Sequence, residues 1–215
     1  MFKEKNYKVL KQAISPELAD FIYKYFLMKR QVARTFYDTK YISPYNTDWG
    51  VWNDQQVPET YSYYADIAME TLLERMLPIM KKETELELIP TYSYARIYKK
   101  GDILKRHKDR FSCEISTTMN LGGELWAIYL DPNPGLAGEG EYKPGNNPGI
   151  KIELNPGDML IYKGELLEHW REAFEGEHCG QVFLHYNNVN TPDSETNKYD
   201  TRPHLGLPSD FKEGK

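Results

Sequence analysis

The hydrophobic pattern of the chain changes its period near residue 90, and this change limits the fold more than any other feature. Before it, apolar residues recur with helical spacing; after it, apolar and polar residues alternate in short runs between turn residues. Helices followed by a series of strands are typical of an α+β architecture with helices on one side of an all-β core. We expect strands at residues 91–98, 103–109, 113–121, 124–130, 150–154, 158–163, 166–172 and 181–187.

Eight short strands with turn signals between most of them predict a sandwich or a barrel. The Pro- and Gly-rich stretch 131–149 is predicted to be a loop within it. A length of 215 residues suits a single domain over 1–215. We expect a helical N-terminal part over about residues 1–90, a β core over about 91–188, and a turn-rich tail that follows the surface.

The N-terminal part is predicted to contain a short strand over residues 7–14 and two helices. Ser15 is a suitable N-cap for the first helix, and Pro16 suits its first turn. An apolar stripe over residues 65–76 predicts the second helix, which Pro78 is expected to end or kink. Residues 31–57 between them read as an irregular aromatic segment, and long loops of this kind are often functional.

The charge of the chain is mildly acidic, with 27 Lys and Arg against 32 Asp and Glu and a net charge of −5. Binding to nucleic acid needs concentrated basic surface, so the overall charge argues against that class of partner. A local basic cluster is the exception. It comprises Lys99, Lys100, Lys105, Arg106, Lys108 and Arg110.

A His-x-Asp pair, His107 and Asp109, lies inside this basic cluster. Residues i and i+2 of a strand point to the same face, so a strand over 103–109 would bring the pair together. His169 falls in a later predicted strand. Two histidines and one carboxylate form the facial triad that binds Fe(II) and leaves three coordination positions open.

Other interpretations of these residues remain. A His-x-Asp pair also arises by chance on charged strand faces, and His178 and His185 compete with His169 for the third ligand position. Cys113 and Cys179 lack the CxxC spacing of a zinc site, and their pairing is left open.

One face of the strand predicted at 91–98 carries an arginine among tyrosines: Tyr92, Tyr94, Arg96 and Tyr98. An unpaired charge is costly in a dry core. A guanidinium with phenol hydroxyls instead suits an anion, because it binds carboxylates bidentately. An anion pocket is therefore predicted, with an ion pair between Arg96 and a nearby glutamate as the alternative.

These segments together resemble the 2-oxoglutarate- and Fe(II)-dependent dioxygenases, and among them the small prolyl-4-hydroxylase-like oxygenases of phages and bacteria. The resemblance spans residues 91–188 and rests on "YARIYKKGDILKRHKDR", "NPGDMLIYKGELLEHWRE" and "QVFLHY". The most specific part of the resemblance is the set Tyr98, Gly101, His107 and Asp109. His169 follows at the expected place in the order of strands. The resemblance implies a double-stranded β-helix (jelly roll, cupin-like), with the His-x-Asp pair near the end of the second strand and the distal histidine on the seventh.

The resemblance also implies the chemistry. Fe(II) and 2-oxoglutarate would be the cofactors, with ascorbate as a supplement, and decarboxylation to succinate would accompany hydroxylation of a C–H bond. It implies no catalytic side chain beyond the metal ligands. A protein or peptide side chain, proline first, is the expected substrate. The alternative substrates are a small molecule and an alkylated nucleobase. The alternative function is a non-catalytic binding module of the same fold. The oligomeric state stays open.

One departure concerns the far carboxylate of 2-oxoglutarate, which the family binds with a basic residue, usually on the eighth strand. Gln181 stands where that residue is expected, and its hydrogen bond would be weaker than a charged pair. Arg171 lies two residues after His169 and would share its face. We therefore predict that Arg171, with Arg96 and Tyr98, binds the carboxylate.

The cellular location is predicted to be cytoplasmic, or the host cytoplasm if a phage encodes the chain. The first residues lack an apolar signal core, and two cysteines suit a reduced intracellular protein. No stretch approaches the roughly 18 apolar residues of a membrane span, so no membrane partner is expected.

Overall fold

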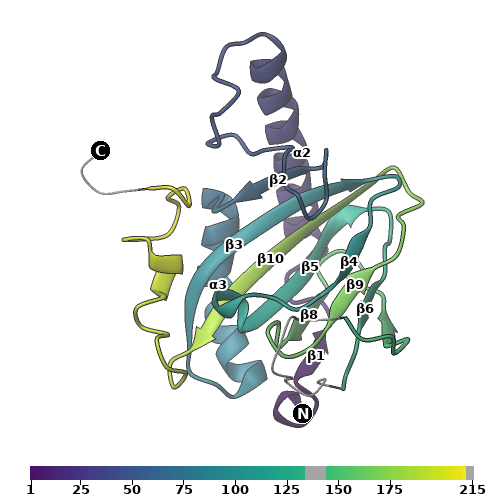
Figure 1. Ribbon diagram of the computed structural model, residues 1–215, viewed down its shortest axis with the longest axis vertical. Helices are drawn as coiled ribbons and strands as arrows, with labels where there is room; N and C mark the ends of the chain where they lie inside the picture. Colours follow the sequence, from purple (N-terminus) through teal and green to yellow (C-terminus); the bar gives the residue numbers. More distant parts are fainter. Residues whose placement is uncertain (134–143, 212–215) are drawn as a thin grey trace.

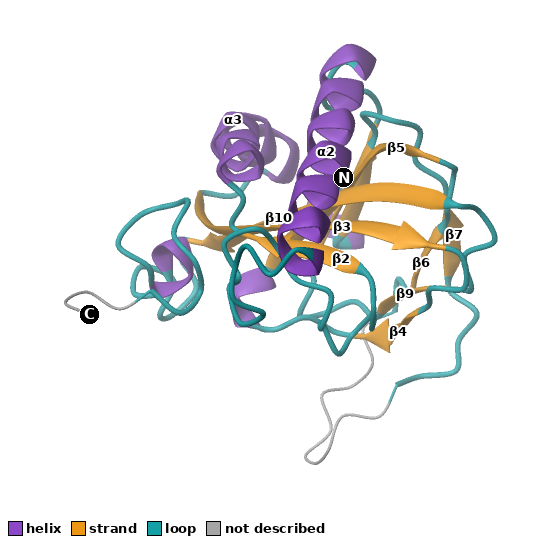
Figure 2. Ribbon diagram, turned by 90° about the horizontal axis from the view of Figure 1, so that it is seen from above, coloured by secondary structure: helices purple, strands orange, loops and turns teal. Residues whose placement is uncertain are grey.

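The computed structural model describes residues 1–133 and 144–211. In these residues, a large antiparallel sheet faces a smaller one, and the helices cover the outer side of the large sheet (Figures 1 and 2). The strand order is β1-β8-β5-β10-β3-β2 in the large sheet and β4-β9-β6-β7 in the small one. The predicted α+β architecture, with helices on one side of a β-helix core, is confirmed.

Apart from α1 and β2, which were not predicted, the helices and strands follow one another in the predicted order. The helices are α1 (Phe2–Lys5), α2 (Pro16–Asp38) and α3 (Ile67–Thr84), with 3-10 turns η1 (Phe111–Cys113) and η2 (Lys198–Thr201). The strands are β1 (Tyr7–Leu10), β2 (Tyr61–Tyr64), β3 (Leu88–Lys99), β4 (Leu104–His107), β5 (Ile115–Gly123), β6 (Ile128–Leu130), β7 (Ile150–Ile152), β8 (Met159–Tyr162), β9 (His169–Arg171) and β10 (His178–Asn188).

Side chains of the large sheet alternate between two different environments. Those on the helix side are apolar and join the main core with α2 and α3. They include Ala95, Ile97, Ile115, Met119, Leu121, Met159, Ile161, Val182, Leu184 and Tyr186. Each fully buried aliphatic side chain contributes roughly 1.5–3 kcal/mol, so this layer is the main source of stability.

The opposite face of the large sheet lies between the sheets and is much more polar. Buried polar residues of β5 and β10 lie there, including Ser116, Thr118, Gln181 and His185. A smaller apolar cluster from β6, β7 and β8 fills only part of the space between the sheets. The inner face therefore keeps polar groups available deep inside the fold.

The first helix is longer than its sequence pattern predicted. Ser15 caps it as expected, since its Oγ accepts a hydrogen bond from the Leu18 amide at 3.3 Å. The helix, however, continues to Asp38, so the segment predicted to be irregular from residue 31 is helical over its first eight residues. Phe36 explains the extension, because its ring packs edge-on against Trp49 with centroids 4.9 Å apart.

The second helix also differs from the prediction, because it passes through Pro78 and ends at Thr84. Proline lacks the N–H that would bond to the Glu74 carbonyl. Both Pro78 and Glu74 lie on the exposed side, where water can hydrate that carbonyl. Met76 and Met80 are fully buried on the other side and hold the helix on the sheet.

The N-terminal part supplies two strands as well as helices. The strand predicted at 7–14 forms β1 over its first four residues and pairs with β8, whereas β2, which the sequence analysis missed, pairs with β3. Both are edge strands of the large sheet. Residues 131–133 and 144–149 have no regular structure, in line with the predicted loop; residues 134–143 lie outside the described part. In the described residues, no helix is long and apolar enough to cross a membrane.

The C-terminal segment is fixed to the fold by a buried ion pair. Arg202 donates to both carboxylate oxygens of Glu70 at 2.8 and 3.3 Å, and each of the two side chains is only 2% exposed. Glu70 also accepts from the Ser93 amide at 3.2 Å and from the Gly206 amide. The pair thus joins α3, β3 and the tail.

Replacing Glu70 by alanine should lower the free energy of unfolding by about 3 kcal/mol or more, because it leaves the Arg202 charge buried without a partner. Equilibrium denaturation would measure the loss. Asp20→Ala provides the control, since its pair with Lys24 is exposed and should contribute less than about 1 kcal/mol. Equal small effects for the two variants would show that the pair does not fix the tail.

Candidate metal centre

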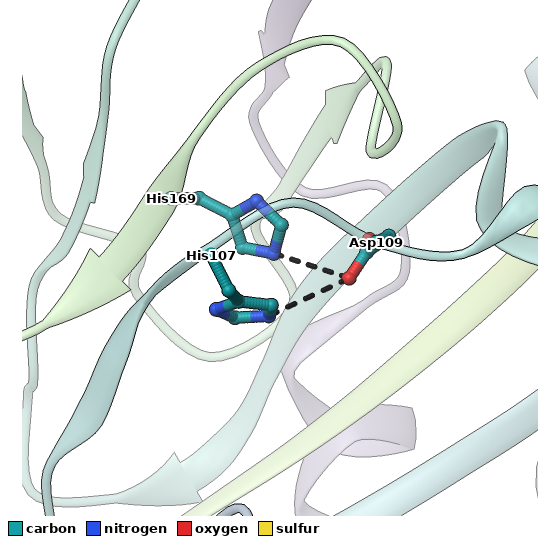
Figure 3. A group of neighbouring side chains, drawn as sticks. All are labelled: His107, Asp109 and His169. Carbon is teal, nitrogen blue, oxygen red and sulfur yellow. Dashed lines mark ion pairs between the residues drawn. The ribbon is translucent and has the colours of Figure 1, made fainter. Parts of the chain in front are cut away.

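Three side chains from two neighbouring strands and the turn after one of them converge inside the sandwich. His107 ends β4, His169 begins β9, and the two are register partners in the small sheet. Their Nε2 atoms lie 3.5 and 3.4 Å from the same oxygen, Oδ1 of Asp109 (Figure 3). The ligand atoms all lie within 4.8 Å of one another, so the group could hold a metal ion.

Backbone carbonyls fix both imidazole rings. Nδ1 of His107 lies 2.7 Å from the Lys105 carbonyl, and Nδ1 of His169 lies 3.1 Å from the Leu167 carbonyl. A carbonyl only accepts, so each Nδ1 carries a proton, and in the neutral ring Nε2 is the nitrogen with the free lone pair. Each neutral imidazole would therefore offer Nε2 to a cation bound beside Asp109, the arrangement that metal-binding histidines require.

The carboxylate of Asp109 is oriented by the large sheet. Its Oδ2 accepts a hydrogen bond from Ser116 Oγ at 2.9 Å, and Ser116 Oγ lies 2.9 Å from Nδ1 of His185. A chain of hydrogen bonds thus runs from His185 through Ser116 to Asp109 and leaves Oδ1 toward the two imidazoles. Gly164 packs against this carboxylate, and a Cβ there would overlap with Oδ2.

The electrostatics of the group keep the carboxylate ionised. Burial raises the pKa of Asp109, but the neighbouring imidazoles, His169 first and then His107, outweigh burial and hold the pKa well below its usual range. Burial lowers the pKa of His169, but Asp109 outweighs it and raises the pKa above its ordinary value. A cation bound at this group would compete with a proton for the His169 imidazole.

The separations suit a transition metal. An ion with bonds of about 2.1 Å places neighbouring ligand atoms about 3 Å apart, close to the 3.4 and 3.5 Å observed. Two imidazole nitrogens and one carboxylate oxygen suit Fe(II) with open positions for other ligands. The residues present therefore fit the metal that the resemblance implies.

The way in which His107 and Asp109 meet differs from the prediction. We expected them to share one face of a strand over 103–109, but β4 ends at His107 and Asp109 lies beyond it. The Asp109 amide donates to the Gly164 carbonyl at 2.9 Å, which turns the chain toward β8. The register of β4 shifts between Leu104 and His107, so Leu104 and His107 both line the cavity while Lys105 is exposed. Beyond the strand end, Lys108 and Arg110 also line the cavity.

A cavity of about 360 Å³ surrounds the metal position. The four residues predicted to form an anion pocket, Tyr92, Tyr94, Arg96 and Tyr98, all line it. Arg96 nevertheless has a partner already, since its guanidinium forms an ion pair with Asp54 and donates to Tyr98 Oη at 3.2 Å. The partner is an aspartate from the loop before β2 and not the glutamate that we considered.

Arg171 and Gln181 lie deeper and are not among the residues that line this cavity. Arg171 is 1% exposed; it donates to the Trp126 carbonyl and, at 3.1 Å, to Thr118 Oγ1. Thr118 Oγ1 in turn donates to Gln181 Oε1 at 3.0 Å. The threonine therefore connects the arginine of β9 to the glutamine that occupies the expected basic position on β10.

The other histidines and cysteines considered as ligands lie outside the His-Asp-His group. His185 lies within 4.8 Å of Asp109 and Cys113 at their ligand atoms, but Ser116 already bridges His185 and Asp109. His178, the other competing ligand, begins β10, is partly buried and is not part of the His-Asp-His group. Both cysteines, Cys113 and Cys179, are buried and free.

Sequence reasoning missed three residues around the metal position. Ser116 carried no signal beyond its place in an alternating strand. Asp54 and Gln56 belong to the long segment flagged as functional, but nothing in its composition singled them out; Gln56 Nε2 lies 3.1 Å from His107 Nε2.

Comparison with known proteins supports the fold. The sequence matches no family model and no curated protein. The structure is similar to a Pseudomonas putida prolyl-4-hydroxylase, with 10% identity over 88% of this chain and 96% of that one and a TM-score of 0.59. It is also similar to the viral collagen prolyl hydroxylase of Paramecium Bursaria Chlorella virus-1 in its 2-oxoglutarate complex, with 10% identity over 87% and 98% of the two chains and a TM-score of 0.55.

A third similar structure is HygX of Streptomyces hygroscopicus with nickel, 2-oxoglutarate and hygromycin B bound. The identity is 13% over 92% of this chain and 93% of that one, with a TM-score of 0.55. The fold is therefore the double-stranded β-helix of the 2-oxoglutarate-dependent oxygenases, as the resemblance predicted. The His-Asp-His group lies between its two sheets.

Metal affinity should fall as the pH is lowered, and the fall should begin above pH 6.5, because Asp109 raises the pKa of His169 above that ordinary value of about 6.5. The neutral imidazole binds the metal, so below its pKa each pH unit should weaken Mn²⁺ binding about tenfold or more. Calorimetric titration from pH 8.5 to 5.5 measures this. His169→Ala should abolish binding, the exposed His204→Ala should not, and pH-independent binding would contradict the assignment.

Proposed function

We propose that this protein is an Fe(II)- and 2-oxoglutarate-dependent dioxygenase that hydroxylates a C–H bond. The convergence of His107, Asp109 and His169 on one cavity of a β-helix fold carries the proposal. When bound there, Fe(II) and 2-oxoglutarate supply the oxidative decarboxylation that yields succinate and carbon dioxide and places one oxygen atom of O₂ in a C–H bond.

The protein's own contribution is to hold and orient the metal. The carbonyls of Lys105 and Leu167 fix the two histidine tautomers, and Ser116 directs one Asp109 oxygen toward them. These outer partners tune metal affinity and ligand orientation. The side chains of His169 and Asp109 are only 3% and 14% exposed, which limits the access of water to them.

Arg171 is proposed to bind the far carboxylate of 2-oxoglutarate. Among the described residues it has no carboxylate partner, and its Nε has no hydrogen-bond acceptor. A buried guanidinium of this kind is costly until an anion pairs with it. Tyr98 and Tyr162 are near enough to interact electrostatically with Arg171, and both line the metal cavity.

Tyr162 is proposed to assist as a hydrogen-bond donor. Burial holds its pKa well above the ordinary value, so the phenol stays protonated. The buried Tyr162 ring packs against His169, with centroids 4.7 Å apart, and the phenol interacts electrostatically with both Asp109 and Arg171. Tyr162 is therefore near both groups that would bind the cosubstrate.

The substrate is proposed to be a protein or peptide side chain, with proline as the first candidate. The two prolyl hydroxylases of similar fold support this choice, together with the aromatic residues Tyr92, Tyr94 and Phe183 that line the cavity. HygX, whose structure contains hygromycin B, keeps a small-molecule substrate as the second candidate.

An alkylated nucleobase is less supported because three of the six basic residues near the motif already form ion pairs. Lys99 pairs with Asp102, Arg106 with Asp131 and Glu168, and Arg110 with Asp200. Paired bases contribute little to phosphate binding. Steeply salt-dependent binding to single-stranded DNA would reverse this ranking.

The purified protein with Fe(II), 2-oxoglutarate and ascorbate should form succinate, and proline-containing peptides should stimulate the reaction. His107→Ala and Asp109→Ala should each reduce succinate formation at least about 100-fold, because the metal loses a ligand. Mass spectrometry of a peptide would show a gain of one oxygen atom. Metal binding without succinate formation under any supplement would favour a non-catalytic binding module.

Arg171→Met should weaken 2-oxoglutarate binding at least about 30-fold, because loss of one partner of a buried charge pair costs about 2–5 kcal/mol. Mn²⁺ affinity should be unchanged, and Arg34→Met serves as an exposed control. Adding Gln181→Lys to Arg171→Met would place a base where the family usually has it and should restore part of the affinity. Unchanged binding by Arg171→Met would show that another residue binds the carboxylate.

A further inference from the structure

Gln56, on the loop between α2 and β2, reaches the metal centre from outside both sheets. Its Nε2 lies 3.1 Å from Nε2 of His107, the nitrogen that faces the metal position. Its Oε1 accepts hydrogen bonds from Nη1 and Nη2 of Arg96 at 3.3 and 3.2 Å. Gln56 also lines the metal cavity, so it connects the arginine on β3 to the metal ligand on β4.

The orientation of this carboxamide follows from hydrogen-bond chemistry. A guanidinium has donors only, so the oxygen of Gln56 must face Arg96 and the NH₂ group must face the site. Arg96 is itself held by its ion pair with Asp54, which also accepts from the Tyr94 hydroxyl. A hydrogen-bond donor is thereby directed at the metal position.

The segment that carries Gln56 is attached to the fold on both sides. Asp54 attaches it to β3 before Gln56. After it, Val57 is 2% exposed in an apolar cluster with Tyr98 and Leu104, and Thr60 donates to Asp102 at 2.7 Å. The position of the carboxamide is therefore built into the structure and does not depend on a free loop end.

A metal ion at the site would take the lone pair of His107 Nε2 and leave the Gln56 NH₂ group without its acceptor. The open coordination positions beside His107 would then present oxygen atoms to it. We propose that Gln56 is a positioning residue that donates a hydrogen bond to the metal-binding keto-acid end of 2-oxoglutarate, while Arg96 and Asp54 hold its amide in the required orientation. This inference rests on the proposed function.

Gln56→Leu and Gln56→Glu test the inference, with the neighbouring exposed Gln55→Leu as a matched control. Calorimetry with Mn²⁺ alone, and then with 2-oxoglutarate added to the Mn²⁺-loaded protein, separates the two ligands. Gln56→Leu should bind Mn²⁺ at least as tightly as the natural protein, since no donor competes for Nε2. It should bind 2-oxoglutarate about tenfold more weakly, because a hydrogen bond to a charged acceptor is lost.

Gln56→Glu should move the two affinities in opposite directions. Its carboxylate would attract the cation and repel the anionic cosubstrate, so Mn²⁺ binding should tighten and 2-oxoglutarate binding should weaken more than in Gln56→Leu. The visible charge-transfer absorption of the anaerobic Fe(II)–2-oxoglutarate complex should shift in both variants. Gln55→Leu should leave all three readouts unchanged.

Natural 2-oxoglutarate affinity and an unshifted absorption band in Gln56→Leu would overturn the inference and show that Gln56 only fills the metal-free site. Failure of the natural protein itself to bind Mn²⁺ or 2-oxoglutarate would instead refute the proposed function. Arg96 keeps its ion pair with Asp54 in both variants, so both should remain folded, which circular dichroism would confirm.

Discussion

The carboxylate of Asp109 joins the two sheets of the sandwich, and the site depends on how it is held. One oxygen faces the imidazoles of β4 and β9, and the other accepts from Ser116 of β5. A buried carboxylate is stable only when its partners offset the loss of hydration, which costs several kcal/mol. The spacing of the sheets, the two imidazoles and the carboxylate therefore depend on one another.

The two faces of the large sheet have different roles: one packs on the helices, and the other carries the polar groups around the site. Along β5 and β10, alternate residues pack on the helices, and their neighbours carry hydroxyl, amide and imidazole groups into the space between the sheets. The apolar layer gives stability, so the inner layer can hold polar groups that contribute little to it. Thr118 illustrates this, since it accepts from Arg171 and donates to Gln181.

Sequence periodicity predicted the helix-then-strand order and the inward Tyr-Arg-Tyr face of β3, because alternation is a local property of extended chain. Strand ends were harder: β4 stops at His107, and the turn that brings Asp109 back depends on a hydrogen bond to Gly164, about 55 residues later. The edge strand β2 and the partner Asp54 of Arg96 were missed for the same reason. Both are set by contacts between distant segments, which no local pattern contains.

The distribution of charge around the cavity explains why Arg171 is the residue proposed to bind the far carboxylate of 2-oxoglutarate. Arg96 and Arg110 are neutralised by Asp54 and Asp200, and Lys108 is only partly buried, so water can hydrate it. A divalent ion with Asp109 and two neutral imidazoles carries a net charge of about +1, and Arg171 adds a second positive charge deeper inside. A linear dicarboxylate has one negative charge at each end. Two separated positive charges, one on the exchangeable metal ion and one on Arg171 of β9, therefore match the two charged ends of such a molecule.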